Sequence, residues 1–400
     1  MRILIVGAGP AGAALSLLLA RRGVEVVLLE REASPERVFR GEALMPSGVD
    51  AISQMGLREQ FAGLPQRTLE CMEFYVEGTR MFRADWPEVA GENSLHIVSQ
   101  PALINMLTSA AAEHARFELR MGSTVRNLEV TDDGVTLRVR NGDIEEELHG
   151  DFVIGADGRA STVRARSGLD IMRLPFPFDV AWFSVPMPST QYEDPRFQVF
   201  TRDDTSVVLY PSWNGQLRLG LNISALQPDG QAKLQKDEML LEAGRVVGEP
   251  YATLIRDHGD EIADPVILKV LFGRCERWTA PRTLLLGDAA HPMSPVRAQG
   301  INLALRDAVV TANHLLPAIE TGDPHALQIA AERIQAERDP EIIESQRLQV
   351  SVARPPAPAR SAFLRSTLLP VMERLGVVKR IYLKTEIPLR HGVVPVELAI

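Results

Sequence analysis

Cysteine is scarce in this sequence, and no other set of metal-binding residues stands in its place. The 400 residues contain 2 cysteines, Cys71 and Cys275, which lie far apart and form no CxxC pair. We therefore expect two reduced core residues in a cytoplasmic protein and no structural disulfide. The 8 histidines are scattered without an HExxH sequence or a Cys/His cluster, so no metal site is predicted.

Long apolar runs and an excess of positive charge are also missing. No stretch reaches the roughly 18 uncharged apolar residues that a membrane-spanning helix needs, although association with a membrane surface stays open. The net charge of −9, without a basic patch among aromatic residues in the first 350 positions, argues against nucleic-acid binding. The length and the 45% hydrophobic content predict a large core divided over two or three domains.

What the sequence does contain is a strand, a glycine-rich turn, a helix and a second strand within residues 2–30. The run 2–6 has the length and β-branched content of a buried parallel strand, and the sequence GAGPAG at 7–12 follows it directly. Gly23 is placed to end the helix before a second strand at 24–30. A GxGxxG sequence in this setting, with an acid about 20 residues later, indicates a dinucleotide site.

Each residue of this pattern has an expected task. Gly7 permits the tight turn, Gly9 lets the backbone approach a diphosphate, and Gly12 allows the helix to pack closely on the strand. The helix N-terminus then directs free N–H groups and its positive dipole end at the diphosphate. Glu30 is expected to bind the ribose hydroxyls of an adenosine and to repel a 2′-phosphate. The pattern therefore predicts FAD or NAD without choosing between them.

A second motif follows the apolar run 151–156, which ends in Asp157-Gly158. Ser161 and Thr162 are placed to cap a following helix, with Arg164 in its first turn. An acid at the carboxyl end of a parallel strand points into the crevice where such sheets bind ligands. An ordinary Asp-Gly turn is the competing interpretation.

The third motif is the most specific. A strand at 283–286 leads into Gly287-Asp288, and Pro295 precedes a helix expected from about 301 to 316. Gly287 allows close backbone approach, and Asp288 is suited to bind a ribitol hydroxyl. The helix N-terminus near Gly300 would place N–H donors beside the pyrimidine edge of a flavin, where the reduced ring is negatively charged. Such a dipole contributes up to ~2 kcal/mol in a partly buried site.

In this order and spacing, the three motifs resemble those of the class A FAD-dependent aromatic hydroxylases. These flavoprotein monooxygenases include p-hydroxybenzoate hydroxylase-like and ubiquinone-pathway hydroxylase-like enzymes. The resemblance covers roughly residues 1 to 345 and implies FAD as cofactor, with NADH or NADPH as a transient reductant. The cofactor contacts that it implies are Gly7, Gly9, Ala11, Gly12, Glu30, Arg31, Arg40, Gln100, Asp157, Gly158, Gly287, Asp288, Pro295, Gly300, Ile301 and Asn302.

The chain departs from the family in its third motif. Many relatives read Pro-x-x-Gly-Gln-Gly where this chain has PVRAQG at 295–300, so Ala298 replaces a glycine and Arg297 stands beside it. A solvent-facing or ion-paired arginine is one interpretation. The other is that the Arg297 guanidinium holds an acidic substrate or stabilises reduced flavin. Pro295 and Arg297 are therefore candidate catalytic residues.

The resemblance implies an α/β fold with a Rossmann-like FAD-binding domain, a mostly antiparallel β-sheet substrate domain and C-terminal helices. Alternating apolar residues in 197–200, 206–210 and 216–222, separated by turn residues, are consistent with such a sheet. The expected division is a discontinuous FAD-binding domain at 1–72, 96–174 and 268–340, a substrate-binding sheet domain at 73–95 and 175–267, and a helical segment at 341–400.

Substrate-facing candidates come from this sheet. Trp182 and Phe183 lie on one expected strand, and Tyr210 and Pro211 lie at the end of another. An aromatic lining suits an aromatic substrate, because ring packing adds about 0.5–1.5 kcal/mol to burial. Simple core packing is the competing interpretation. Tyr210 is also the candidate general base.

The last segment is basic. Between Ala353 and Gly392 there are eight Lys or Arg residues against two Glu. One interpretation is a C-terminal helix that packs over both domains, and the other is a basic amphipathic contact with an acidic membrane surface or a partner protein. The apolar stripe behind both consists of Leu364, Leu368, Val371, Met372 and Leu375.

The resemblance implies that NAD(P)H reduces the flavin, that O₂ adds to form a C4a-hydroperoxide, and that one oxygen atom passes to an aromatic or electron-rich small molecule. No second GxGxxG unit occurs, so a separate nicotinamide domain is not expected. Two alternatives stay open, a prenyl reductase of the geranylgeranyl type and a non-catalytic flavin-binding scaffold. A tryptophan-type halogenase is disfavoured, because the four tryptophans are isolated and form no Trp-x-Trp-x-Ile-Pro element.

Overall fold

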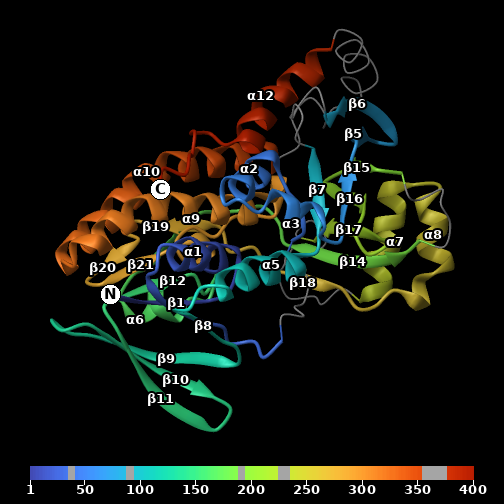
Figure 1. Cartoon of the computed structure of the whole chain (residues 1–400). Coiled ribbons are helices and arrows are strands. Elements are labelled where there is room, and N and C mark those ends of the chain that lie inside the picture. Colours follow the sequence, from blue (N-terminus) through green and yellow to red (C-terminus); the bar gives the residue numbers. More distant parts are fainter. Residues whose placement is uncertain (35–40, 87–93, 188–193, 224–234, 354–375) are drawn as a thin grey trace.

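A six-stranded sheet forms the first layer of the protein (Figure 1). The computed structural model describes residues 1–34, 41–86, 94–187, 194–223, 235–353 and 376–400. The strand order is β20-β21-β12-β1-β2-β8, and every neighbouring pair is parallel except β20 with β21. The strands are β1 (Arg2–Val6), β2 (Glu25–Leu29), β8 (Phe117–Arg120), β12 (Phe152–Gly155), β20 (Thr279–Ala280) and β21 (Thr283–Leu285).

Helices cover one side of this sheet and a small antiparallel sheet covers the other (Figure 1). Helix α1 packs against α5 and α9, and α10 packs on α9. Both sides are therefore covered, which explains why β1 and β2 are almost continuously apolar. The covering elements are α1 (Pro10–Arg21), α5 (Gln100–Ala112), α9 (Gln299–Thr321), α10 (Pro324–Ala353), β9 (Ser123–Val130), β10 (Val135–Asn141) and β11 (Ile144–Gly150).

A seven-stranded sheet forms the second part, in the order β18-β14-β17-β16-β15-β5-β6. The sheet is mixed, because β15 and β5 run parallel while the other neighbouring pairs are antiparallel. Its strands are β5 (Cys71–Val76), β6 (Thr79–Asp85), β14 (Val180–Pro186), β15 (Arg196–Arg202), β16 (Thr205–Pro211), β17 (Gln216–Asn222) and β18 (Val266–Leu268). The expectation of a mostly antiparallel sheet omitted the parallel pair, since β5 comes from a distant part of the chain.

The two faces of the seven-stranded sheet have different partners. Helices α7 (Lys236–Val247) and α8 (Tyr251–Asp257) bury one face in an apolar core that includes Phe183 and Leu219. The other face looks toward the loops of the six-stranded sheet and toward α12 (Val377–His391), whose Leu383 packs against it. Figure 1 shows α12 running from α10 toward β6.

Short elements connect these two parts. Residues of β3, β7 and η4 belong to or pack against the apolar cluster that includes Tyr210 of the second sheet. They are β3 (Ala43–Leu44), α2 (Pro46–Gln54), α3 (Arg58–Ala62), β4 (Gln66–Leu69), β7 (Leu95–Val98), α6 (Thr162–Arg166), β13 (Ile171–Arg173), η2 (Gly259–Glu261), β19 (Gly273–Cys275), η3 (Gly287–Ala289) and η4 (Val296–Ala298).

The structure bears on two expectations about the whole chain, the membrane-spanning helix and the fold class. Among the described residues, no helix combines the length and the apolar character needed to cross a bilayer. The mixed α/β fold is confirmed. The residue boundaries of the domains stay predictions. Arg40 and the apolar stripe between Leu364 and Leu375 lie outside the described residues.

Candidate functional site

The turn between β1 and α1 is packed so tightly that it excludes side chains. Gly7 has φ +102°, and a Cβ on it would lie 2.4 Å from the carbonyl oxygen of Ala156. A Cβ on Gly12 would lie 2.0 Å from the carbonyl oxygen of Gly7. Among the described residues, the nearest atom to a Cβ on Gly9 would be 4.0 Å away, so there is room on the ligand side of the turn. The turn between β1 and α1 therefore fits a dinucleotide diphosphate at the start of α1.

Glu30 is buried at the end of β2 and oriented by the backbone. Its Oε2 accepts a hydrogen bond from the N–H of Ala8 at 2.9 Å, and its Oε1 accepts one from Glu32 at 3.1 Å. These bonds hold the carboxylate beside the glycine turn, where an adenosine ribose would lie. Arg31 is exposed and pairs with Glu32 at 3.1 Å. Gln100 is half-buried in the first turn of α5, which packs against α1.

Asp157 caps the N-terminus of α6. Its carboxylate accepts hydrogen bonds from the Ser161 hydroxyl and from the N–H groups of Thr162, at 2.6 Å, and Val163, at 3.2 Å. Burial raises the pKa of Asp157, and these hydrogen bonds oppose that rise. These hydrogen bonds fix the turn at Gly158, while the predicted contact of Asp157 with the cofactor stays a prediction.

Two arginines join the second and third motifs. Arg159 Nε lies 3.2 Å from Asp288 Oδ2, and Arg164 Nη1 donates to the carbonyl oxygen of Ala289 at 2.8 Å. Asp288 is partly exposed and so stays accessible to a ligand. The partner Arg159 was not predicted, because its relation to Asp288 depends on the parallel pairing of β12 with β21.

The loop 294–298, named here the Pro295 loop, leads into the N-terminus of α9. Arg297 (φ 62°, ψ 20°) and Ala298 (φ 49°, ψ 43°) are both in the left-handed region, which costs roughly 1–2 kcal/mol for each residue with a Cβ. Among the described residues, nothing lies within 4 Å of a Cβ placed on Gly300, while Ile301 is buried. Asn302 Oδ1 accepts a hydrogen bond from the N–H of Met45 at 2.8 Å, which ties α9 to the start of α2.

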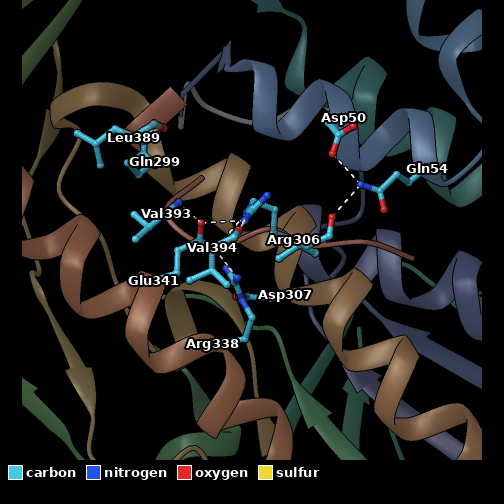
Figure 2. A network of polar contacts seen from close by, with 11 residues as sticks. Asp50, Gln54, Gln299, Arg306, Asp307, Arg338, Glu341, Leu389, Val393 and Val394 are labelled. Atoms are coloured by element: carbon cyan, nitrogen blue, oxygen red, sulfur yellow. Dashed lines mark hydrogen bonds and ion pairs between the residues drawn. The ribbon is translucent and has the colours of Figure 1, made fainter. Parts of the chain in front are cut away.

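A buried charge network lies behind the third motif (Figure 2). Asp307 Oδ2 accepts a hydrogen bond from the N–H of Gly287 at 3.1 Å and lies 2.8 Å from His291 Nε2. Its Oδ1 accepts one from Arg338 Nε at 2.8 Å. Burial alone would raise the pKa of Asp307, but His291 and Arg338 outweigh it and lower the pKa to about 2. The network therefore fixes the backbone of the Gly-Asp turn.

The lowered pKa makes a prediction for acid stability. Asp307 should contribute stability that is fully present above about pH 4 and lost as the pH falls toward 2, because its pKa drops from 3.8 to about 2 on folding. We expect the free-energy difference between wild type and Asp307→Asn, measured by urea unfolding, to shrink over this range. Asp143→Asn, at a fully exposed aspartate, is the control and should show no such pH dependence. A constant difference for Asp307→Asn would contradict the assignment.

The second sheet presents an aromatic face to these motifs. One row of residues runs across the neighbouring strands of this face, and its side chains are apolar and half-buried or buried. In this row Gly220 lies between Trp182 and Val208. Ala298 of the Pro295 loop packs against the same cluster. We define the aromatic face by Trp182, Val208, Val199, Phe74, Phe82, Tyr210, Phe197 and Met72.

A polar group lies at one end of this face. Buried Glu42 pairs with Arg218, with Nε and Oε1 3.1 Å apart, and accepts a hydrogen bond from the Ser212 hydroxyl at 3.0 Å. Arg218 also donates to the Ser184 hydroxyl and stands opposite Tyr210 in the sheet. Neither Glu42 nor Arg218 was predicted as a site residue, because the two come from distant parts of the chain and no local pattern indicates that they pair.

Tyr210 is a neutral phenol in this setting. Burial, and then the Glu42 carboxylate, raise the pKa of Tyr210 well above its usual value. Its ring stacks on Phe197 with centroids 5.2 Å apart and meets Trp182 edge-on at 6.4 Å. A phenol that stays protonated is unsuited to be a general base at neutral pH. Tyr210 is therefore suited to hydrogen bonding and packing.

The four predicted substrate residues do not all lie together. Trp182 and Tyr210 are on the aromatic face, whereas Phe183 is buried on the opposite face against α7 and α8. Pro211 follows Tyr210 and so points away from it. The placement of Phe183 corrects the prediction, because neighbouring residues of one strand cannot share a face. Arg297 extends toward the aromatic face, with Nη1 3.6 Å from Met72 Sδ.

The comparisons with known proteins agree with this geometry. A family model described as FAD binding domain matches residues 1–338. The chain is 31% identical over 361 residues to 6-methylpretetramide 4-monooxygenase of Streptomyces rimosus, covering 88% of this chain and 83% of that protein. It is 27% identical to rifampicin monooxygenase of Streptomyces venezuelae, covering 88% of this chain and 71% of that protein.

The fold has a close counterpart among solved structures. The crystal structure of p-nitrophenol 4-monooxygenase from Pseudomonas putida superposes with a TM-score of 0.79 at 20% identity, covering 98% of this chain and 99% of that one. The similarity therefore extends over both sheets and the C-terminal helices.

Proposed function

This chain belongs to the FAD binding domain family, and we propose that it hydroxylates a flat, electron-rich aromatic compound held on the aromatic face. The chain is an FAD-dependent monooxygenase that consumes NAD(P)H. Bound FAD, once reduced, supplies the activation of O₂ from which one oxygen atom reaches the substrate. The alternative of a prenyl reductase is not favoured, since both relatives described above are named monooxygenases.

One observation carries the proposed substrate class. Ala298 packs against the cluster that contains Tyr210, so the Pro295 loop and the aromatic face meet. The start of α9 lies directly after this loop and is suited to the pyrimidine edge of the flavin. A flat ring between them would lie on Trp182 and Tyr210, where stacking and burial favour aromatic over aliphatic compounds.

The remaining roles follow from the placement of each side chain. The start of α1 would bind the diphosphate, Glu30 the adenosine ribose and Asp288 the ribitol chain. Tyr210, kept protonated, would donate or share a hydrogen bond with a polar substituent of the substrate. The surrounding apolar side chains would exclude water from the reacting carbon.

The test of the proposed function is substrate-dependent NAD(P)H oxidation by the purified holoenzyme. A panel of phenols, quinolones and polyprenyl phenols would be compared, with mass detection of added oxygen. We expect aromatic compounds with a hydroxyl or amino group to accelerate oxidation and to gain one oxygen atom. Oxidation that no compound accelerates, without an oxygenated product, would contradict the proposal.

Arg297 is proposed to hold an acidic group of the substrate beside the flavin. Its guanidinium extends from the Pro295 loop to Met72 on the aromatic face. We expect Arg297→Ala to raise the KM for a substrate with a phenolate or carboxylate about tenfold, while the KM of a neutral analogue changes little. The loss of one charge-assisted hydrogen bond supports this size of effect. Equal KM changes for both compounds would rule the role out.

Gly220 gives a prediction for the floor of this face. A Cβ there would lie 2.7–3.0 Å from three ring atoms of Trp182, so Gly220→Ala must displace the indole. We expect a KM for substrate about tenfold higher and a loss of roughly 1–3 kcal/mol in stability, with FAD affinity unchanged. The matched control is Gly244→Ala in α7, where the added Cβ makes ordinary contacts at 3.8 Å or more. An unchanged KM in Gly220→Ala would contradict substrate binding at Trp182.

We also propose a cytoplasmic location, which the two buried free thiols support.

The basic tail packs on the rest of the protein through α12. Leu383 packs against the apolar cluster that includes Phe82, and the guanidinium of Arg390 lies 3.6 Å from the ring centroid of Trp86. A contact with an acidic membrane surface or a partner stays a hypothesis, with Ile381 and Lys384 exposed on α12. Binding of anionic liposomes by the full chain, lost on deletion of 353–400, would support it, and no binding would exclude it.

A further inference from the structure

The Pro295 loop is held by amide side chains from outside it. Gln349 on α10 makes a reciprocal pair with Ser294, whose N–H donates to Gln349 Oε1 at 3.3 Å and whose carbonyl accepts from Nε2 at 3.2 Å. The same Nε2 also donates to the carbonyl oxygen of Val296. Gln349 therefore contacts the backbone on both sides of Pro295.

Two further amides complete the support. Gln299 Nε2 donates to the carbonyl oxygen of Arg297 at 2.8 Å, and Asn302 Nδ2 donates to that of Ala298 at 2.6 Å. Gln299 Nε2 also donates to the carbonyl oxygen of Leu389 at 2.8 Å, so the end of α12 is tied to the loop. Gln299 and Asn302 belong to the third motif, but Gln349 lies outside every motif of the sequence.

This support matters because the loop is strained. Arg297 and Ala298 both adopt left-handed backbone angles, which glycine adopts without the cost that a residue with a Cβ incurs. A strained backbone persists only where its surroundings fix it. Gln349 is fully buried and comes from a helix that packs on α9, so it is placed to fix the loop against relaxation.

We propose that Gln349 is a positioning residue for the flavin, acting through the Pro295 loop. It holds the loop so that the first N–H groups of α9 are directed at the pyrimidine edge, which favours the negatively charged reduced ring. The inference rests on the proposed function, because it requires flavin beside this loop. Loss of Gln349 should therefore weaken FAD binding and make the bound flavin harder to reduce.

The test compares Gln349→Met with the matched control Gln346→Met. Gln346 is also buried on α10, where it donates to the backbone carbonyl of Gly273 at 2.6 Å and accepts from Arg274 Nη1 at 2.9 Å. Among the described residues, no hydrogen bond joins Gln346 to the Pro295 loop. For both variants, the FAD dissociation constant, the reduction potential of bound flavin and the melting temperature are measured. Gln349→Asn, a shorter amide, is included in case Gln349→Met does not fold.

We expect both methionine variants to melt at lower temperature. Only Gln349→Met should change the FAD affinity and the reduction potential of the bound flavin. The FAD dissociation constant of Gln349→Met should rise about tenfold. Its preference for binding reduced over oxidised flavin should fall about tenfold, which lowers the reduction potential of the bound flavin by about 30 mV. Gln349→Asn should give an intermediate drop. Wild-type potential and FAD affinity in the Gln349 variants, or equal changes in Gln346→Met, would overturn the inference. Failure of the wild-type protein to bind FAD would instead overturn the proposed function.

Discussion

Replacing Glu341 by leucine should destabilise the protein by about 3–5 kcal/mol, because it leaves two buried guanidinium groups short of a carboxylate. Glu341 is fully buried between Arg306, whose Nη2 lies 2.9 Å from Oε1, and Arg338 (Figure 2). Its Oε1 also accepts a hydrogen bond from the N–H of Val393 at 2.8 Å, which attaches the C-terminal segment. Burial would raise the pKa of Glu341, but the two arginines lower it, so the carboxylate is charged in the folded protein.

The measurement is the free energy of unfolding in urea, with Glu344→Leu as the matched control. Glu344 lies one turn away on α10 and pairs with Arg347, which is two-thirds exposed, so its loss should cost at most about 1 kcal/mol. Glu341→Leu, but not Glu344→Leu, should also release the segment after Leu389, which would appear as faster amide exchange in that segment. Equal losses of stability in the two variants would show that the buried network contributes no more than a surface ion pair.

A second large effect is expected in the glycine turn, where two single methyl groups should separate folding from cofactor binding. Gly12→Ala puts a Cβ 2.0 Å from a backbone oxygen, so the turn itself must move, and both stability and FAD affinity should fall. Gly9→Ala meets its nearest described neighbour only at 4.0 Å and keeps an allowed backbone (φ −73°, ψ −178°). Its methyl group would instead occupy the space of the diphosphate.

We therefore expect FAD affinity to fall at least about 100-fold in both variants. The apo form should lose roughly 2–4 kcal/mol of stability in Gly12→Ala, and less than about 1 kcal/mol in Gly9→Ala. Fluorescence quenching of FAD and urea unfolding of the apo form are the two readouts. If Gly9→Ala binds FAD like the wild type, the diphosphate does not lie at this turn.

The parts of the site that were predictable are those in which one short segment determines its own shape. The turn at Gly7, the carboxylate of Glu30 beside it and the helix after Gly300 follow from local spacing. The class of fold and the choice of FAD over NAD came from the resemblance of these motifs, in their order, to those of a known family. Relations between distant segments were not predictable, because no local pattern encodes which residues meet.

The pairs that were missed illustrate this limit. Glu42 meets Arg218 only after the second sheet docks on the first, and Gln349 meets the Pro295 loop only through the packing of α10. Phe183 was assigned with Trp182 because both are aromatic, although the period of a strand separates them onto opposite faces. The parallel pairing of β5 with β15 likewise depends on how the chain returns to the sheet.

The most direct test of the whole account is the origin of the oxygen atom in the product. The purified FAD-loaded protein would turn over an accelerating aromatic compound with NAD(P)H under ¹⁸O₂, and the product mass would be determined. A monooxygenase with substrate held between the Pro295 loop and the aromatic face predicts one ¹⁸O atom per product from ¹⁸O₂ and none from H₂¹⁸O. Product oxygen that comes from water, or peroxide as the only oxygen product with every compound tested, would contradict it.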